Sequence, residues 1–361
     1  MNRSTELPSP SPSPSPSDQM APEEFDGGTA VACVILGLSF LVGAPGNLLV
    51  IWTILRHVKQ RSHTVMLILH LAVADLLVLV TLPLWIYSLA RAWLLGEALC
   101  KALVYIVSVC MFGSIFFITL MSVERYFAIC HPFAMMRWRR ESAMNGCLVL
   151  LWAFALLLGA PSLLTGPLDG RDGSEQCFVF EFTSETRAIA MLCLETSCGF
   201  VVPFIILGIC YSRVAAQLRK MSFESKPKST LLVHAVVIAF ALCWSPYHVV
   251  NAIDLVCILG SGAERECVPE SVVFGSGALA FISSSVNPVL YALFARNLQE
   301  SLERSRLVRL FQEMAAHTNT LRDVVVRQQT GQRAADSQTE LMSDRGGKVT
   351  VPTGTCDVSP L

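Results

Sequence analysis

Asn287-Pro-Val-Leu-Tyr291 closes the last of several long apolar runs, and this stretch decides what kind of protein the chain forms. Pro288 removes one backbone hydrogen bond from a helix, and inside a lipid bilayer no water molecule replaces it. Asn287 and Tyr291 add polar side chains at the same depth, so this helix has to face other helices rather than hydrocarbon. A polar-lined membrane helix with a proline is typical of a protein that changes conformation: a receptor, a transporter or a channel.

The composition also indicates a membrane protein. Of the 361 residues, 53% are hydrophobic and only 15% are charged, and the mean hydropathy is +0.54. Soluble domains carry about a quarter charged residues, so the deficit points to lipid as the main solvent. The 13 cysteines lie mostly in apolar runs without the spacing of metal ligands. Because no nucleophile–base arrangement appears either, we expect no enzymatic activity.

Seven apolar runs are long enough to cross a bilayer, which takes about 20 helical residues. They cover residues 29–56, 64–89, 99–130, 143–165, 187–218, 230–258 and 271–294. The predicted fold is therefore an all-α membrane protein, a seven-transmembrane helix bundle over residues 29–294. A transporter is the disfavoured alternative, because the seven runs show no duplicated halves with paired interrupted helices.

Charged residues divide between the two sets of loops and predict the orientation. One set is basic, whereas the other set and the N-terminal segment are acidic. Basic loops stay on the cytoplasmic side, so the N-terminus is expected outside and the C-terminus inside. The basic residues are Arg56, Lys59, Arg61, Arg137, Arg139, Arg140, Arg219, Lys220, Lys226 and Lys228, and the acidic ones are Glu23, Glu24, Asp26, Asp169, Asp172, Glu175, Glu181, Glu264, Glu266 and Glu270.

Three segments flank the bundle. Residues 1–28 contain a Pro-Ser alternation and are predicted to be disordered and extracellular, with a glycosylation sequon at Asn2. Residues 295–312 place apolar side chains at helical spacing among arginines, which predicts a short amphipathic eighth helix parallel to the inner leaflet. Residues 313–361 are polar and rich in Ser and Thr, as in a disordered cytoplasmic tail open to phosphorylation.

Asp75 stands in the middle of the second apolar run, where an ionised group needs a cavity or a partner. Ser114, Ser283, Ser284 and Asn287 offer oxygen atoms from other runs. Together these groups can enclose a sodium ion, which prefers hard oxygen ligands. The alternative is a protonated Asp75 in a hydrogen-bonded cluster, and the sequence leaves both open.

Glu124-Arg125-Tyr126 follows the third run at its cytoplasmic edge. The adjacent opposite charges can hold one conformation and release it when the arginine finds another partner. The alternative is an arginine that extends to lipid phosphates.

Two pairs of cysteines lie on the predicted outer side. Cys100 opens the third run and Cys177 lies in the largest outer loop, so oxidising conditions allow them to pair. Cys257 and Cys267 flank the last outer loop, and the sequence leaves their pairing open.

Taken together, the motifs resemble the rhodopsin-like (class A) family of G-protein-coupled receptors over about residues 29–311. The matches occur in order in all seven runs: Gly46-Asn47, Leu71-Ala-Val-Ala-Asp75, Glu124-Arg-Tyr126, Trp152, Pro203 with Tyr211, Cys243-Trp-Ser-Pro246 and Asn287-Pro-Val-Leu-Tyr291. The resemblance implies a receptor at the plasma membrane whose sixth helix swings outward to admit a heterotrimeric G protein. It assigns Ile115, Pro203 and Phe240 to a transmission triad, and Glu124, Arg125, Tyr126, Tyr211 and Tyr291 to coupling and activation. It also implies that arrestin and receptor kinases act on the phosphorylated tail.

Within that family the chain resembles the chemoattractant branch, and most of all the leukotriene B4 receptors, through Pro246-Tyr-His248-Val-Val-Asn251, Leu194-Glu-Thr196 and the segment 283–291. The resemblance implies a lipid agonist, inhibitory G proteins with calcium mobilisation, and roles in chemotaxis and the inflammatory response. The expected ligand-binding residues are Tyr105, Arg187, Glu195, Trp244, His248, Asn251 and Lys101. Gly166 and Val273 stand where leukotriene B4 receptors carry arginines, so a peptide chemoattractant or another lipid mediator remains an alternative.

Overall fold

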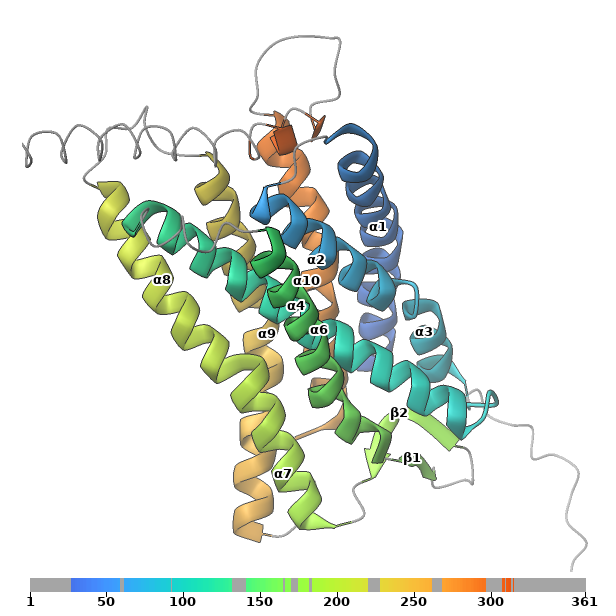
Figure 1. Cartoon of the computed structure of the whole chain (residues 1–361). Helices are drawn as coiled ribbons and strands as arrows, with labels where there is room; N and C mark the ends of the chain where they lie inside the picture. The colour runs from blue at the N-terminus through green and yellow to red at the C-terminus, as the bar shows by residue number, and fades with distance from the viewer. Residues whose placement is uncertain are drawn as a thin grey trace, which may run out of the picture.

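The computed structural model describes residues 27–58, 62–91, 93–131, 141–164, 166–169, 175–181, 184–219, 228–261 and 268–296, together with residues 307, 308, 310–312 and 314. Within these residues, seven helical stretches are long and apolar enough to cross a membrane. They are Gly27–His57, His63–Ala90, Glu97–Cys130, Met144–Leu164, Glu185–Gln217, Leu231–Gly260 and Ser271–Leu293. Each end lies within two residues of the predicted run, so the seven-span bundle is confirmed (Figure 1).

The helices are α1 (Gly27–His57), α2 (His63–Leu79), α3 (Leu82–Ala90), α4 (Glu97–Cys130), α6 (Glu141–Gly159), α7 (Glu185–Thr196), α8 (Val202–Arg219), α9 (Lys228–Ser261) and α10 (Glu270–Arg296). A 3₁₀ turn (Ala160–Leu164) extends α6, and a π-helical turn (Ser197–Val201) joins α7 to α8. Side chains such as Val149, Leu150 and Leu242 are about 70% exposed (68%, 69% and 71%) on these spans. Their exposure fits a surface that contacts lipid, because water-soluble proteins rarely expose large continuous apolar patches.

Prolines act differently at different places in the bundle. Pro246 and Pro288 lie inside α9 and α10, and both helices run through them without interruption. The second span is instead divided: α2 ends at Leu79, and α3 begins at Leu82 with Pro83 in its first turn. A proline fits the first turn of a helix because its missing N–H has no partner there.

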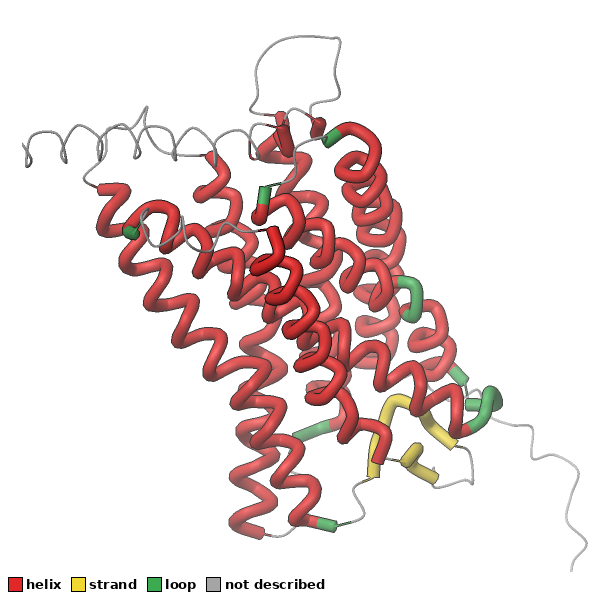
Figure 2. The backbone as a smooth tube through the Cα atoms, in the orientation of Figure 1, coloured by secondary structure: helices red, strands yellow, loops and turns green. Residues whose placement is uncertain are grey.

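A two-stranded antiparallel sheet lies at one end of the bundle, and it was not predicted (Figure 2). Strand β1 (Gly166–Asp169) pairs with β2 (Glu175–Glu181), and the register shifts between Pro167 and Leu168. The shift occurs beside a proline, which has no N–H to donate to the ladder.

The predicted eighth helix is described only in part. Leu307, Val308, Leu310, Phe311 and Gln312 are helical, and Val308, Leu310 and Phe311 are buried. The Phe311 ring lies 5.9 Å from that of Tyr291, and the Gln312 side chain donates to the His57 carbonyl at 3.1 Å. The apolar side of this segment therefore packs near the C-terminal ends of α1 and α10. Its course along a membrane stays a prediction. Residues 1–26 of the predicted N-terminal segment, including Asn2, lie outside the described residues, and so does the predicted tail apart from Met314. Gly27 and Gly28, predicted to be disordered, begin α1.

Candidate functional site

A buried polar cluster around Asp75 occupies the middle of the bundle. Asn287 donates to one oxygen of the Asp75 carboxylate at 2.8 Å, and the Ser114 hydroxyl donates to the other at 3.0 Å. Ser284 also donates to Asp75. Asn47, at the same level of α1, donates to the Ser284 carbonyl at 2.9 Å and ties α1 to this cluster.

Ser283 lies apart from Asp75 in this arrangement. Its hydroxyl donates to the Ala280 carbonyl at 2.7 Å and accepts from the Trp244 indole at 3.1 Å. Of the five residues expected to enclose sodium, the structure therefore brings together Asp75, Ser114, Ser284 and Asn287, whereas Ser283 lies apart. A carboxylate with two hydroxyls and an amide is a set of hard oxygen donors, which fits a small cation once these groups reorient.

Glu124, Arg125 and Thr64 form a second buried cluster near the C-terminal end of α4. A Glu124 oxygen lies 3.4 Å from an Arg125 nitrogen, and the Arg125 side chain is only 2% exposed. The Thr64 hydroxyl donates to Glu124 at 2.6 Å and accepts a hydrogen bond from Arg125. The arginine is therefore held inside the bundle rather than extended toward lipid phosphates.

The other residues assigned to activation occupy varied places. Ile115, Pro203 and Phe240 are buried, and Phe240 lies 5.6 Å from Trp244 between ring centroids. Tyr291 is buried. Tyr126 and Tyr211 lie farther out: the Tyr126 hydroxyl pairs with His131 at 2.9 Å, and Tyr211 is exposed.

A third polar cluster lies between α7 and α9, in the half of α9 that leads to its C-terminal end. The Tyr247 hydroxyl donates to the Glu195 carboxylate at 2.8 Å. His248 is buried between two rings, 4.6 Å from Phe200 and 5.7 Å from Trp244. Neither ring nitrogen of His248 has a hydrogen-bond partner among the described residues, and the Asn251 amide nitrogen has none there either.

The remaining ligand-binding candidates do not join this cluster. Tyr105 donates to the Leu156 carbonyl at 3.3 Å, and Lys101 pairs with Glu97 at 2.6 Å. Arg187 is exposed in the first turn of α7, where Ser184 caps the helix by accepting from the Arg187 backbone N–H at 3.4 Å. Both cationic groups stand at the outer rim rather than beside Glu195.

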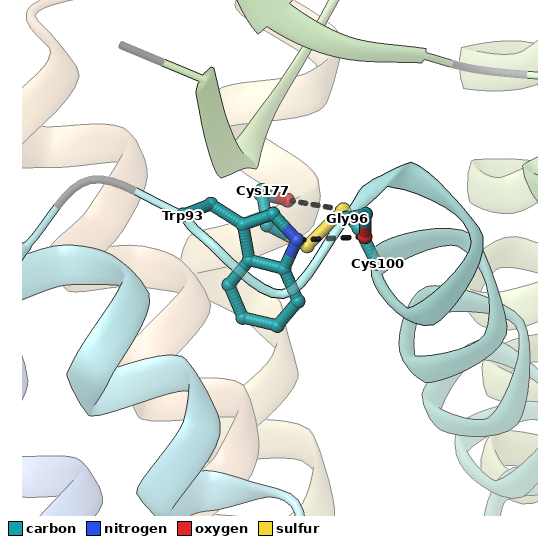
Figure 3. The surroundings of a disulfide bond; sticks show 4 residues. All are labelled: Trp93, Gly96, Cys100 and Cys177. Carbon is teal, nitrogen blue, oxygen red and sulfur yellow. Dashed lines mark hydrogen bonds between the residues drawn. A yellow bond between two sulfur atoms is a disulfide. The ribbon is translucent and has the colours of Figure 1, made fainter.

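A disulfide bond between Cys100 and Cys177 ties the outer end of α4 to β2, as predicted (Figure 3). Beside it, the Trp93 indole donates to the Gly96 carbonyl at 2.9 Å and folds the segment between α3 and α4. Cys257 is also disulfide-bonded, whereas Cys267, the candidate partner whose pairing the sequence leaves open, lies outside the described residues.

Two residues of these clusters, Thr64 and Tyr247, were not assigned from the sequence. Tyr247 had a usable signal, because it lies within one turn of Trp244 and Asn251 on the same helix. Thr64 had none, since a threonine at the start of a helix usually indicates a cap.

Comparisons with known proteins agree with this geometry. Residues 46–291, more than half of the chain, match the family model described as 7 transmembrane receptor (rhodopsin family). Leukotriene B4 receptor 1 of Homo sapiens is 32% identical over 301 residues, which cover 81% of this chain and 84% of the relative. Leukotriene B4 receptor 2 of Homo sapiens is 37% identical over 293 residues, with 78% and 81% covered. Atypical chemokine receptor 3 of Canis lupus familiaris is 31% identical over 276 residues, with 74% and 76% covered.

Proposed function

Since the chain belongs to the rhodopsin family of seven-transmembrane receptors, we propose that its agonist is leukotriene B4 or a related oxygenated fatty acid. Membership makes the chain a G-protein-coupled receptor, a multi-pass protein of the plasma membrane and not an enzyme. The class of agonist is a finer assignment than family membership provides. It is supported by the leukotriene B4 receptors among the similar proteins and by the chemistry of the outer cluster.

The observation that carries the proposal is the set of buried nitrogen atoms without partners. His248 and Asn251 are both buried, and three of their nitrogen atoms make no hydrogen bond within the described residues. A buried polar group without a partner costs roughly 1–3 kcal/mol. Hydroxyl groups of an oxygenated fatty acid satisfy such atoms, and they can also donate to Glu195.

Arg187 is the proposed anchor for the agonist carboxylate. It lies eight residues before Glu195, about 12 Å along the helix. A fatty acid whose hydroxyl reaches Glu195 can therefore place its carboxylate at the outer rim, near Arg187. Because an exposed ion pair is screened by water, this anchor contributes less than the buried hydroxyl contacts.

Cells that express the chain provide the test, with calcium and cyclic-AMP responses measured against a panel of lipid and peptide agonists. We expect a response to leukotriene B4, and a loss of potency of about five- to fiftyfold in Tyr247→Phe, which deprives the half-buried Glu195 of its donor. Arg187→Ala is expected to lower potency several-fold, whereas Arg91→Ala, at another exposed arginine, serves as the matched control. A lipid-insensitive receptor, or a Tyr247→Phe variant with unchanged lipid potency, would count against the proposal.

A peptide chemoattractant is the second candidate, and Asp254 favours it. This half-buried carboxylate lies one turn beyond Asn251, toward the outer end of α9. Together with Glu195 it suits a cationic ligand group, and a chemokine receptor is among the similar proteins. If the receptor responds to peptides and this response disappears in Asp254→Asn, the agonist is a peptide rather than a lipid.

Signalling is proposed to use inhibitory G proteins, with arrestin and receptor kinases acting on the tail. The agonist is expected to favour a conformation in which α9 swings outward at its cytoplasmic end. Pertussis toxin should abolish the cyclic-AMP response, and toxin-insensitive signalling would exclude the inhibitory class.

A sodium ion is proposed to bind at Asp75 in the inactive conformation, through oxygen atoms of Ser114, Asn287 and Ser284. If it does, sodium should lower agonist affinity in the wild type and have no effect in Asp75→Asn, because the ion and the agonist favour different conformations. If sodium changes agonist affinity equally in the wild type and in Asp75→Asn, sodium does not bind at Asp75.

A further inference from the structure

Tyr211 of α8 and His234 of α9 form a ring contact in the cytoplasmic half of the bundle. Their ring centroids lie 4.7 Å apart at an interplanar angle of 62°, an edge-to-face arrangement. Tyr211 is 44% exposed, whereas His234 is half-buried. The contact therefore holds the Tyr211 ring at the outer surface of the bundle.

The same two side chains line a small cavity beside Arg125. Ser122 and Arg125 of α4 and Cys210 of α8 complete its polar lining, and the rest is leucine and valine. The cavity has room for about one water molecule. Arg125 and Cys210 are both buried in this conformation, so little of either side chain is accessible from outside the bundle.

The backbones of α8 and α9 approach each other closely at few places. Side-chain contacts between the inner ends of these helices, such as this ring pair, therefore have to hold them together. An edge-to-face ring pair is the kind of contact that a small outward movement of one helix breaks completely.

We propose that His234 is a positioning residue that holds Tyr211 at the surface and α9 against α8, and so keeps the cavity beside Arg125 closed until agonist binds. The proposal deepens the proposed function and rests on it, because α9 is the helix expected to swing outward. Losing the ring contact should shift the balance of closed and open forms by about two- to tenfold.

The test uses the complete receptor in detergent, without ligand, and follows alkylation of its own cysteines by a small water-soluble maleimide. Cys210 lines the cavity and reacts only when the cavity opens. Cys110 is buried in α4, is not among the lining residues, and reports general loosening of the bundle. Peptide mass spectrometry gives both rates from one sample.

His234→Leu keeps the bulk of the side chain and removes the ring, whereas His234→Phe keeps a ring. We expect His234→Leu to raise the Cys210 rate about two- to tenfold with Cys110 unchanged, and His234→Phe to stay near wild type. An unchanged Cys210 rate in His234→Leu, an equal rise in both variants, or a parallel rise at Cys110 would each overturn the proposal. If His234→Leu does not fold, Tyr211→Leu removes the same contact from α8 and must give the same rise.

Basal signalling per receptor at the cell surface separates this proposal from the proposed function. A matching rise of about two- to tenfold in His234→Leu supports both. Faster Cys210 alkylation without increased signalling supports the role of His234 and contradicts G-protein coupling through this cavity.

Discussion

Thr64 joins the two charged side chains at the cytoplasmic end of α4. Its hydroxyl donates to Glu124 at 2.6 Å and accepts from Arg125, and all three side chains are buried. Thr64→Val keeps the shape and removes the hydroxyl. A hydrogen bond to a charged group contributes about 1.5 kcal/mol or more, so the closed form should lose about tenfold in population. Ligand-free nucleotide exchange on purified G protein measures this rise.

Thr119→Val is the matched control for Thr64→Val. The Thr119 hydroxyl donates to the Ile115 carbonyl of its own helix at 2.8 Å and bridges no helices. Its loss should leave basal exchange near wild type. If Thr64→Val does not exceed Thr119→Val in basal exchange, Thr64 has no part in holding the closed form.

At the residue scale, the sequence indicated the depth of the polar clusters along the membrane spans. It did not always indicate which of two neighbouring side chains contacts the partner. Asp75 and Asn287 meet at 2.8 Å, as their depth in the apolar runs indicates. Ser284 rather than Ser283 reaches Asp75, and Tyr247 rather than His248 reaches Glu195. Neighbouring helical residues point about 100° apart, so choosing between them requires the rotation of each helix, which only packing determines.

Between elements, α1 and α10 pack closely because Gly46 has no side chain. A Cβ atom there would lie 2.7 Å from the Cβ of Pro288, and neither atom can rotate away. Gly46→Ala should force the helices apart at a cost of about 1–3 kcal/mol and lower the melting temperature by roughly 3–10 °C. Thermal unfolding of the purified receptor measures the change.

Gly37→Ala gives the comparison within the same helix. A Cβ atom at Gly37 meets nothing within 4 Å among the described residues, so only helix propensity changes, in favour of alanine. Its melting temperature should stay the same or rise slightly. Equal losses in both variants would show that contact with Pro288 is not the cause.

At the element scale, hydropathy predicts spans well and short elements poorly. All seven spans follow from runs of apolar residues, because lipid requires about 20 of them in a helix. Strand β1 does not, since Gly166, Pro167 and Asp169 are poor strand formers, and β2 needs it as a partner. The two strands lie in the connection that contains Cys177. The disulfide bond of Cys177 to Cys100, which is distant in the sequence, therefore holds a sheet that the local sequence does not favour.

Across the whole molecule, the Cys100–Cys177 bond joins residues 77 apart in sequence and holds β2 over the outer end of the bundle. Closing a loop of this length contributes up to about 4 kcal/mol of stability in the chain-entropy model. Replacing both cysteines by alanine should lower the melting temperature and weaken agonist binding by about tenfold or more, because the hairpin is released. Radioligand binding and thermal unfolding check the two effects, and Cys193→Ala, at an exposed free cysteine, is the control. Unchanged agonist affinity in the double variant would show that the hairpin does not shape the site.

The orientation of the whole bundle follows from its charges. The last turn of α1 carries Arg56 and His57 and the last turn of α8 carries Arg219, whereas the hairpin at the opposite end carries Asp169 and Glu175 (Figure 1). Basic ends stay in the cytoplasm, so the N-terminus should lie outside the cell and the C-terminus inside. An epitope tag at the N-terminus should bind antibody on intact cells, and a tag at the C-terminus only after permeabilisation. If the N-terminal tag binds antibody only after permeabilisation, the orientation of the bundle is the reverse of the predicted one. The Glu195 cluster would then lie on the cytoplasmic side, where an extracellular agonist cannot reach it.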